Sequence, residues 1–368
     1  MDYILSRISE QITAARANFR PIEIVGGGTK RFYGNPPPES TGQEALQLQM
    51  STLTGVVNYQ PSELVLTAWA GTPLSDIEAT LAEQNQMMAF DPPSFGSGAT
   101  IGGAIAAGLS GPLSFGYGPL RHYVLGTQLL DAQGRILKFG GEVMKNVAGY
   151  DVSRLLTGSM GMFGAIVQVS IKVMPKPLVD QTLCFECDEK QALTLCEALR
   201  SKTWPVKAAA WLPADRGEGG QLALRLCGAQ SAVKQAIEVL GGQAIDETAA
   251  KAWWTAFRDQ KTFFFAQHPL WRLAVKARTP ALDIGRTAFD LGGEVRWVQA
   301  QAQPAVIRKM ASEAGGHATL FRWDHVQQTP PDGVFQPLDQ TSIAVVKRLK
   351  EELDPKFIFN VGRLVAGI

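Results

Sequence analysis

Short apolar runs that end in glycine dominate the first half of this chain and predict a strand-rich fold. Alternating or briefly continuous apolar positions predict strands at Ile22–Val25, Ala45–Met50, Gly55–Tyr59, Leu64–Ala70 and Ala165–Val173, with a hairpin formed by Tyr123–Leu130 and Arg135–Phe139. One helix is expected from Pro73 to about Gln84, because Thr72 and Pro73 supply an N-cap and a favoured first helical residue.

The pattern changes after Met174–Pro177, whose two prolines we interpret as a domain boundary. Strands are then expected at Gln181–Glu186, Ala208–Leu212, Leu222–Leu226, Trp271–Ala277, Glu294–Gln299 and Ala318–Phe321. Helical spacing is found at Lys190–Arg200, Ser231–Leu240, Ala281–Leu291, Ala305–Ala314 and Thr341–Leu353. This alternation predicts an α+β domain, an antiparallel sheet covered by helices on one face. Aromatic residues are concentrated between Trp253 and Trp271. We interpret them as part of the core, with an apolar surface for a partner as the alternative.

One segment, Pro92 to Leu120, carries no charge over twenty-nine residues, and eight of these are glycine. Its length would suit a membrane span, but its four prolines would break a helix and leave backbone groups unpaired in lipid. Glycine costs conformational entropy on ordering and lets the backbone approach another group closely. We therefore expect this segment to lie against a large ligand.

Composition narrows the classes of function. Of the 368 residues, 45% are apolar and 19% charged, which predicts a folded protein of two or three domains. The net charge is +1 and the basic residues are dispersed, so nothing indicates nucleic-acid or anionic-membrane binding. The first sixteen residues lack the apolar core of a signal peptide, and the four cysteines favour a reducing compartment and buried thiols over a metal site. A cytoplasmic location is expected.

Three glycine-rich loops lie beside predicted strands and could bind phosphate. Gly26-Gly27-Gly28-Thr29-Lys30 follows a strand, yet it lacks the Gly-Lys-Ser/Thr of a Walker loop, and Pro36–Pro38 prevents the helix of a Rossmann loop. The second loop, Thr100 to Gly108, predicts a tight turn that leads into a short helix of small residues. The third, Gly158 to Gly164, runs directly into a strand. Three such loops fit an elongated cofactor better than a mononucleotide.

These loops belong to a set of motifs that resembles the FAD-binding domain of the vanillyl-alcohol-oxidase/PCMH superfamily. The set is Gly26–Thr29, Pro61-Ser62-Glu63, Ala70-Gly71-Thr72, Asp91-Pro92-Pro93, Thr100–Gly103, Lys145–Asp151 and Gly158-Ser159-x-Gly161. Within that superfamily, Lys145–Asp151 and Gly316–Arg322 are similar to the small FAD-binding subunit of glycolate oxidase. The resemblance implies a PCMH-type FAD-binding domain at 1–177, with subdomains of about 1–88 and 89–177. An α+β cap domain would follow at 178–354, and a tail at 355–368 would return to the first domain.

The resemblance also implies which residues hold FAD. The family's terminal Asn-Pro-Gly-Arg matches Asn360–Arg363, with Val361 in place of the proline. The implied cofactor residues are Gly26, Gly27, Gly28, Thr29, Lys30, Pro92, Thr100, Gly102, Gly103, Ile105, Gly111, Tyr117, Lys145, Gly158, Ser159, Gly161, Ile166, Asn360 and Arg363. Thr29 stands where relatives that attach the flavin covalently carry histidine, so non-covalent FAD is expected. The His-x-Gly-Asp-Gly-Asn-x-His metal motif of larger glycolate and D-lactate subunits is missing, and no metal is expected.

Oxidation of a 2-hydroxy acid needs a base for the hydroxyl proton and a cation for the carboxylate. His317 with Arg322, and His122 with Arg121, are the candidates, although a hydrogen-bonded structural histidine is the alternative for each. The resemblance implies an accessory FAD subunit for assembly or electron transfer, working with a larger FAD subunit that oxidises glycolate to glyoxylate. An iron–sulfur subunit would pass electrons to a membrane acceptor, and through the complex the chain would lie peripherally at the inner membrane. The alternatives are a self-sufficient oxidase of a small hydroxy acid or alcohol, and a non-catalytic scaffold.

Overall fold

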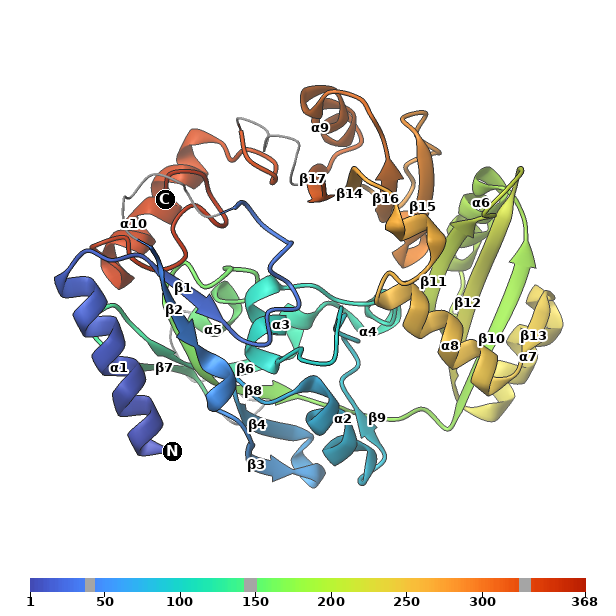
Figure 1. Ribbon diagram of the computed structural model, residues 1–368. Coiled ribbons are helices and arrows are strands. Elements are labelled where there is room, and N and C mark those ends of the chain that lie inside the picture. Colours follow the sequence, from blue (N-terminus) through green and yellow to red (C-terminus); the bar gives the residue numbers. More distant parts are fainter. Residues whose placement is uncertain (37–43, 142–150, 324–331) are drawn as a thin grey trace.

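The computed structural model describes residues 1–36, 44–141, 151–323 and 332–368, which form two bodies side by side (Figure 1). The first body is built on a five-stranded antiparallel sheet in the order β3-β4-β8-β6-β7. Its strands are β3 (Val56–Gln60), β4 (Val65–Trp69), β6 (Val124–Leu130), β7 (Ile136–Gly140) and β8 (Ala165–Lys172). Strand β8 is central and buried along almost all its length.

Two small sheets and several helices complete this body. Strands β1 (Ile22–Val25) and β2 (Leu46–Gln49) pair in parallel, and β5 (Gln86–Met87) pairs with β9 (Met174–Pro175). The helices are α1 (Asp2–Ala17), α2 (Leu74–Ala82), α3 (Ile101–Ala107), α4 (Ser114–Tyr117) and α5 (Val152–Leu155), with single 3-10 turns at Met50–Thr52, Pro61–Glu63 and Leu120–His122. Leu74, Ile77 and Leu81 of α2 are buried in one core with the helix α3, as their spacing predicts.

The second body is an eight-stranded antiparallel sheet in the order β13-β10-β12-β11-β15-β16-β14-β17. Its strands are β10 (Val179–Glu186), β11 (Val206–Pro213), β12 (Gly220–Gly228), β13 (Gln243–Ile245), β14 (Leu270–Ala274), β15 (Arg286–Asp290), β16 (Val295–Gln299) and β17 (His317–Arg322). Helices α6 (Glu189–Arg200), α7 (Gln230–Leu240), α8 (Glu247–Arg258) and α9 (Pro304–Glu313) pack on it, with 3-10 turns at Phe263–Ala266 and Leu291–Gly293. In Figure 1, α8 lies on the side of this sheet that faces the first body.

Helix α10 (Gln340–Leu353) and the residues after it return to the first body (Figure 1). The backbone N–H of Ile22 donates to the Ile358 carbonyl at 2.7 Å, and that of Asn360 donates to the Ile22 carbonyl at 2.9 Å. Lys350 and Asp354 form a fully buried ion pair of 2.7 Å, and Lys350 Nζ also donates to the Phe359 carbonyl at 2.8 Å. These contacts fasten the last residues beside β1.

The α+β class with an antiparallel second sheet is confirmed, and so is the short helix after Thr100. The predicted helix Ala281–Leu291 is wrong. Arg286–Asp290 is strand β15, whose residues Thr287 to Asp290 are all buried between β11 and β16. A strand that is buried on both faces does not alternate between apolar and polar residues. From the sequence alone it cannot be distinguished from a buried helix. Helices α1 and α8 were not expected from the sequence; α8 places Trp254 and Phe257 of the aromatic-rich segment in a core.

Candidate functional site

A groove forms where the loop after β1 meets the N-terminus of α3. Thr100 caps α3 by accepting a hydrogen bond from the Gly103 N–H at 3.2 Å. The Gly102 N–H donates to the Ala70 carbonyl at 2.8 Å, and a Cβ at Gly102 would lie 2.6 Å from that of Ala70. A Cβ at Gly27 would lie 1.5 Å from the Gly98 carbonyl oxygen. Glycine is therefore required where the two loops touch.

The groove brings together most of the cofactor residues that the sequence predicts. Those that line it are Gly26, Gly27, Gly28, Thr29, Lys30, Thr100, Gly102, Gly103, Gly161, Ile166, Asn360 and Arg363. In the described part of the chain, the backbone N–H groups of Gly27, Gly28 and Thr29 have no hydrogen-bond acceptor. Successive free N–H groups beside a helix N-terminus suit a pyrophosphate. The residues present therefore fit the phosphate-bearing part of a dinucleotide such as FAD.

The C-terminal residues Asn360 and Arg363 shape the groove by bonding to its loops. Asn360 Oδ1 accepts from the Ile24 N–H at 2.8 Å, and Asn360 Nδ2 donates to the Met160 carbonyl at 2.6 Å. The Arg363 guanidinium donates to the carbonyls of Tyr33 and Asn35 at 2.6 and 2.7 Å. Asn360 therefore connects β1 to the third glycine-rich loop, and Arg363 holds the loop after β1 in place.

Lys30 lies at one end of the groove in a half-buried, aromatic setting. Its Nζ donates to the Ser94 carbonyl at 3.4 Å and lies 5.6 Å from the centre of the Phe95 ring. Burial lowers the pKa of Lys30 to about 8, although the Asp259 carboxylate acts in the opposite direction. A lysine with this pKa can exchange its proton near neutral pH.

The other predicted cofactor residues lie outside this groove. Ile105 is fully buried in the core, and Pro92 and Ser159 are buried as well. Gly111 packs against Asp91, where a Cβ would lie 2.1 Å from the carbonyl oxygen. Tyr117 lies under Lys207, whose Nζ is 5.0 Å from the ring centre. Gly158 lines a different cavity, and Lys145 lies outside the described residues.

That different cavity lies between the two bodies and contains two of the predicted catalytic residues. His122 from the turn after the glycine-rich segment and His317 from β17 both line it, together with Arg121 and Arg272. The cavity shares Ala107 and Met160 with the groove, so the two adjoin. Burial, followed by the positive charge of Arg272, lowers the pKa of His317. His317 is therefore neutral at pH 7, the form that can accept a proton.

The structure does not bring Arg322 into this cavity. Arg322 is at the end of strand β17, where the pairing with β14 shifts register between Leu320 and Arg322, and its side chain packs among aromatic rings instead. Its guanidinium lies 3.9 Å from the centre of the Phe32 ring, and its Nε donates to Gln260 Oε1 at 3.1 Å. Burial lowers the pKa of Arg322 to about 10.

Sequence reasoning missed Arg272, the arginine that does share the cavity with His317. Arg272 on β14 is opposite Thr319 of β17, and His317 lies two residues from Thr319 on the same face. Strand pairing, which a single sequence does not display, is what makes Arg272 and His317 neighbours.

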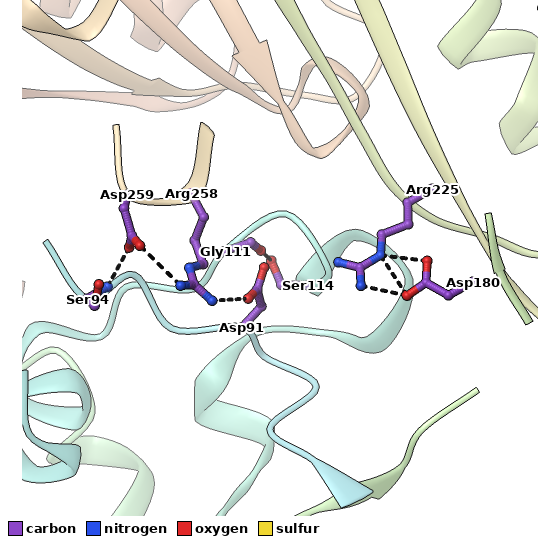
Figure 2. Close-up of polar contacts among 8 residues, drawn as sticks. All are labelled: Asp91, Ser94, Gly111, Ser114, Asp180, Arg225, Arg258 and Asp259. Atoms are coloured by element: carbon purple, nitrogen blue, oxygen red, sulfur yellow. Dashed lines mark hydrogen bonds and ion pairs between the residues drawn. The ribbon is translucent and has the colours of Figure 1, made fainter. Parts of the chain in front are cut away.

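Polar contacts join the two bodies near the glycine-rich segment (Figure 2). Arg258 at the end of α8 lies 3.0 Å from Asp91 and 3.1 Å from Asp259, and Asp259 accepts from the Ser94 N–H at 2.7 Å. Burial alone would raise the pKa of the Asp259 carboxyl. Hydrogen bonding to Arg258 outweighs this effect and keeps that pKa below its usual value. Figure 2 also shows Arg225 paired with Asp180, both within the second body.

Comparison with known proteins identifies the family. The chain is 38% identical over 360 residues to the glycolate oxidase subunit GlcE of Escherichia coli (strain K12), a match that covers 98% of this chain and 97% of that protein. Residues 6–140 match the FAD binding domain family model. The chain belongs to the GlcE family. It is accordingly an FAD-binding protein of an oxidoreductase family.

Two further similarities agree with this assignment. The glycolate oxidase subunit GlcD of Bacillus subtilis (strain 168) is 30% identical over 200 residues, covering 54% of this chain and 42% of that protein. The crystal structure of p-cresol methylhydroxylase superposes with a TM-score of 0.71 at 15% identity, over 99% of this chain and 87% of that one. The latter likeness concerns the fold alone, and it confirms the PCMH-type fold of this family member. None of the helices in the described ranges is long and apolar enough to cross a bilayer.

The described residues offer no alternative metal-based centre. No group of three or more histidine, cysteine, aspartate or glutamate side chains within these ranges could hold a metal ion. Cys184, Cys196 and Cys227 are buried free thiols, and burial raises the pKa of each. They are therefore protonated and unsuited to metal binding or nucleophilic attack at neutral pH.

Proposed function

We propose that this protein is the FAD-binding subunit of a heteromeric glycolate oxidase, in which a larger flavin subunit converts glycolate to glyoxylate. The observation that carries the proposal is the groove at the start of α3, combined with membership of the GlcE family over nearly the whole chain. FAD, when bound, supplies two-electron redox chemistry. The chain's own role is then to hold this cofactor without a covalent bond and to support assembly or electron transfer.

The groove residues have distinct expected roles. The free N–H groups of Gly27, Gly28 and Thr29 would donate to the pyrophosphate, with the Lys30 ammonium as a positive charge lining the same groove. The side chains of Ile166 and Met160 form an apolar wall of the groove. Asn360 and Arg363 hold the surrounding backbone in position. Pro92, Ile105, Gly111, Tyr117 and Ser159 would act through packing around the groove.

The assembly belongs to the same proposal. The partners would be a GlcD-like flavin subunit and an iron–sulfur subunit, and the complex would lie in the cytoplasm or peripherally at the inner membrane. A self-sufficient oxidase is the second candidate, because His122, His317 and Arg272 line a cavity beside the groove. A base and a cation near a flavin are what oxidation of a small hydroxy acid requires.

One experiment distinguishes these candidates. The chain is purified alone, its visible spectrum is recorded, and glycolate is added without oxygen. Releasable yellow cofactor that glycolate does not bleach, with bleaching restored by adding the co-expressed larger subunit, supports the accessory role. Bleaching of the isolated chain would instead establish the self-sufficient oxidase. A folded, colourless chain that cannot take up FAD would leave only a scaffold role.

A further inference from the structure

One residue of the glycine-rich segment connects the groove to the second body. The Ser94 carbonyl accepts from Lys30 Nζ at 3.4 Å, and the Ser94 N–H donates to Asp259 Oδ1 at 2.7 Å (Figure 2 shows the latter bond). Lys30 lines the groove, whereas Asp259 follows helix α8 of the second body. Within the described ranges, no residue of the second body lines the groove itself. Asp259 therefore acts on a ligand in the groove through its neighbours Ser94 and Lys30.

Asp259 is an acidic group whose charge reaches the Lys30 ammonium. Its side chain is only 3% exposed, so water screens this charge poorly. Burial lowers the pKa of Lys30, the Asp259 carboxylate raises it, and the Arg258 guanidinium lowers it again. Without the carboxylate, the lysine would lose its proton at a lower pH.

Most of the other charges around Lys30 are positive. The charged groups on the surrounding elements are Arg31 and Glu23 near β1, Arg258 at the end of α8, Arg322 on β17, and Arg363 near the C-terminus. Glu23 is paired with Arg31 at 2.7 Å. Like charges favour the neutral form of a lysine, so Asp259 is the carboxylate placed to offset them.

The ion pairs of Arg258 leave negative charge available to Lys30. Arg258 lies 3.0 Å from Asp91 and 3.1 Å from Asp259, so the cluster joins two carboxylates to one guanidinium (Figure 2). One negative charge in this cluster is therefore not balanced within it. The Lys30 ammonium, on the other side of Ser94, supplies the balancing positive charge.

We propose that Asp259 is a positioning residue for the cofactor: it keeps the Lys30 ammonium charged and beside Ser94, at the end of the groove. The second body then adds to the affinity for the cofactor's phosphates without lining their site. Cofactor binding and contact between the two bodies become linked, since separating the bodies removes Asp259 from Lys30. The inference rests on the proposed function in taking FAD as the ligand, but the effect of Asp259 on Lys30 is present before any ligand binds.

The first measurement follows the protonation of Lys30 in the full chain without FAD. Competitive acetylation of the lysines, quantified by mass spectrometry from pH 6 to pH 10, gives the midpoint at which the Lys30 amine becomes reactive. We expect this midpoint at a pH of about 8 in the parent, as its pKa indicates. Asp259→Asn, whose amide oxygen can still accept from the Ser94 N–H, should move the midpoint to lower pH.

The second measurement is the affinity for FAD, followed by flavin fluorescence. At pH 6, where Lys30 is charged in both proteins, Asp259→Asn should bind FAD within about twofold of the parent. At pH 8 it should bind roughly threefold to tenfold more weakly, because a smaller fraction of its Lys30 is charged. In the Lys30→Met background, Asp259→Asn should not change the pH profile.

The matched control is Asp91→Asn, which removes the other carboxylate partner of Arg258. The pKa of Lys30 responds to the charges of Asp259 and Arg258, so this variant should leave the midpoint close to the parental one. Should Asp259→Asn fail to fold, Asp259→Ser also removes the charge and carries the same comparison.

Two results would overturn the inference: a midpoint that Asp259→Asn does not move, and one that Asp91→Asn moves equally far. A pH profile that Asp259→Asn still shifts in the Lys30→Met background would do the same. A shifted midpoint in a chain that binds no FAD would support the effect of Asp259 on Lys30 and overturn the proposed function.

Discussion

Gly27 illustrates how one residue type decides the shape of the groove. The position has no room for a side chain, since a Cβ would collide with the Gly98 carbonyl. Gly27→Ala should therefore push the two loops apart and weaken FAD binding by about tenfold or more, the loss of one to two hydrogen bonds to phosphate. Flavin fluorescence during titration with FAD measures the effect.

The control for this change is Gly228→Ala at the end of β12. A Cβ there meets only Pro205, at an ordinary 3.5 Å, and the position is remote from the groove. It should retain the parental affinity for FAD. Equal affinities of Gly27→Ala and the parent would mean that the loop contact does not shape the cofactor site.

Lys30 gives the affinity for FAD a pH dependence. Its pKa of about 8 in the cofactor-free protein means that it loses its charge as the pH rises from 7 to 9. The FAD pyrophosphate is anionic and favours the charged lysine, so affinity should fall through this window, by roughly threefold to tenfold. The Lys30→Met variant should bind more weakly at pH 7 and show a flatter profile. A parental profile that matches that of the variant would exclude Lys30 as the titrating group.

At the scale of elements, the buried pair of Lys350 and Asp354 connects α10 to the end of the chain. Asp354→Asn leaves one oxygen to accept from the N–H groups of Ile358 and Phe359, where the carboxylate offers one oxygen to each, and it leaves the Lys350 ammonium buried without a counter-ion. We expect a loss of about 3–5 kcal/mol in the free energy of unfolding, measured by urea denaturation. Replacing the lysine as well, in Lys350→Met/Asp354→Asn, should restore part of that loss. A double variant less stable than Asp354→Asn would contradict an electrostatic origin.

The helices and strands differ in how well the sequence predicts them. Strands β1, β4, β6 and β8 were recognisable because alternating residues or closing glycines mark them, and α3 because Thr100 is a good N-cap. Strand β15 was mistaken for a helix because its burial on both faces removes the alternation. The groove could be predicted because its glycine-rich loops are local features that can be recognised in the sequence. The cavity could not be predicted, because Arg272 and His317 are brought together only by the pairing of β14 with β17.

For the whole molecule, the contacts of Arg258 in Figure 2 determine how the two bodies are held together. Arg258→Met would leave Asp91 and Asp259 without their cation, so we expect a loss of ~3 kcal/mol in the free energy of unfolding. Limited proteolysis at the Met174–Pro177 connection should also become faster. Arg225→Met breaks an ion pair inside the second body and serves as the control. Because Arg225 is about as buried as Arg258, this variant should also lower the free energy of unfolding, but it should leave the proteolysis rate unchanged. Equal proteolysis of both variants would show that Arg258 does not join the two bodies.

The bond from Asn360 to Ile24 of β1 spans 336 residues of sequence, and the bond from Arg363 to Tyr33 in the loop after β1 spans 330. Contacts so distant along the chain form late in folding, because the intervening polypeptide must first be ordered. A ribosome that has translated all three glycine loops has still not made the residues that hold the first of them in place. We therefore expect a nascent chain that stops before Asn360 to leave the ribosome without flavin.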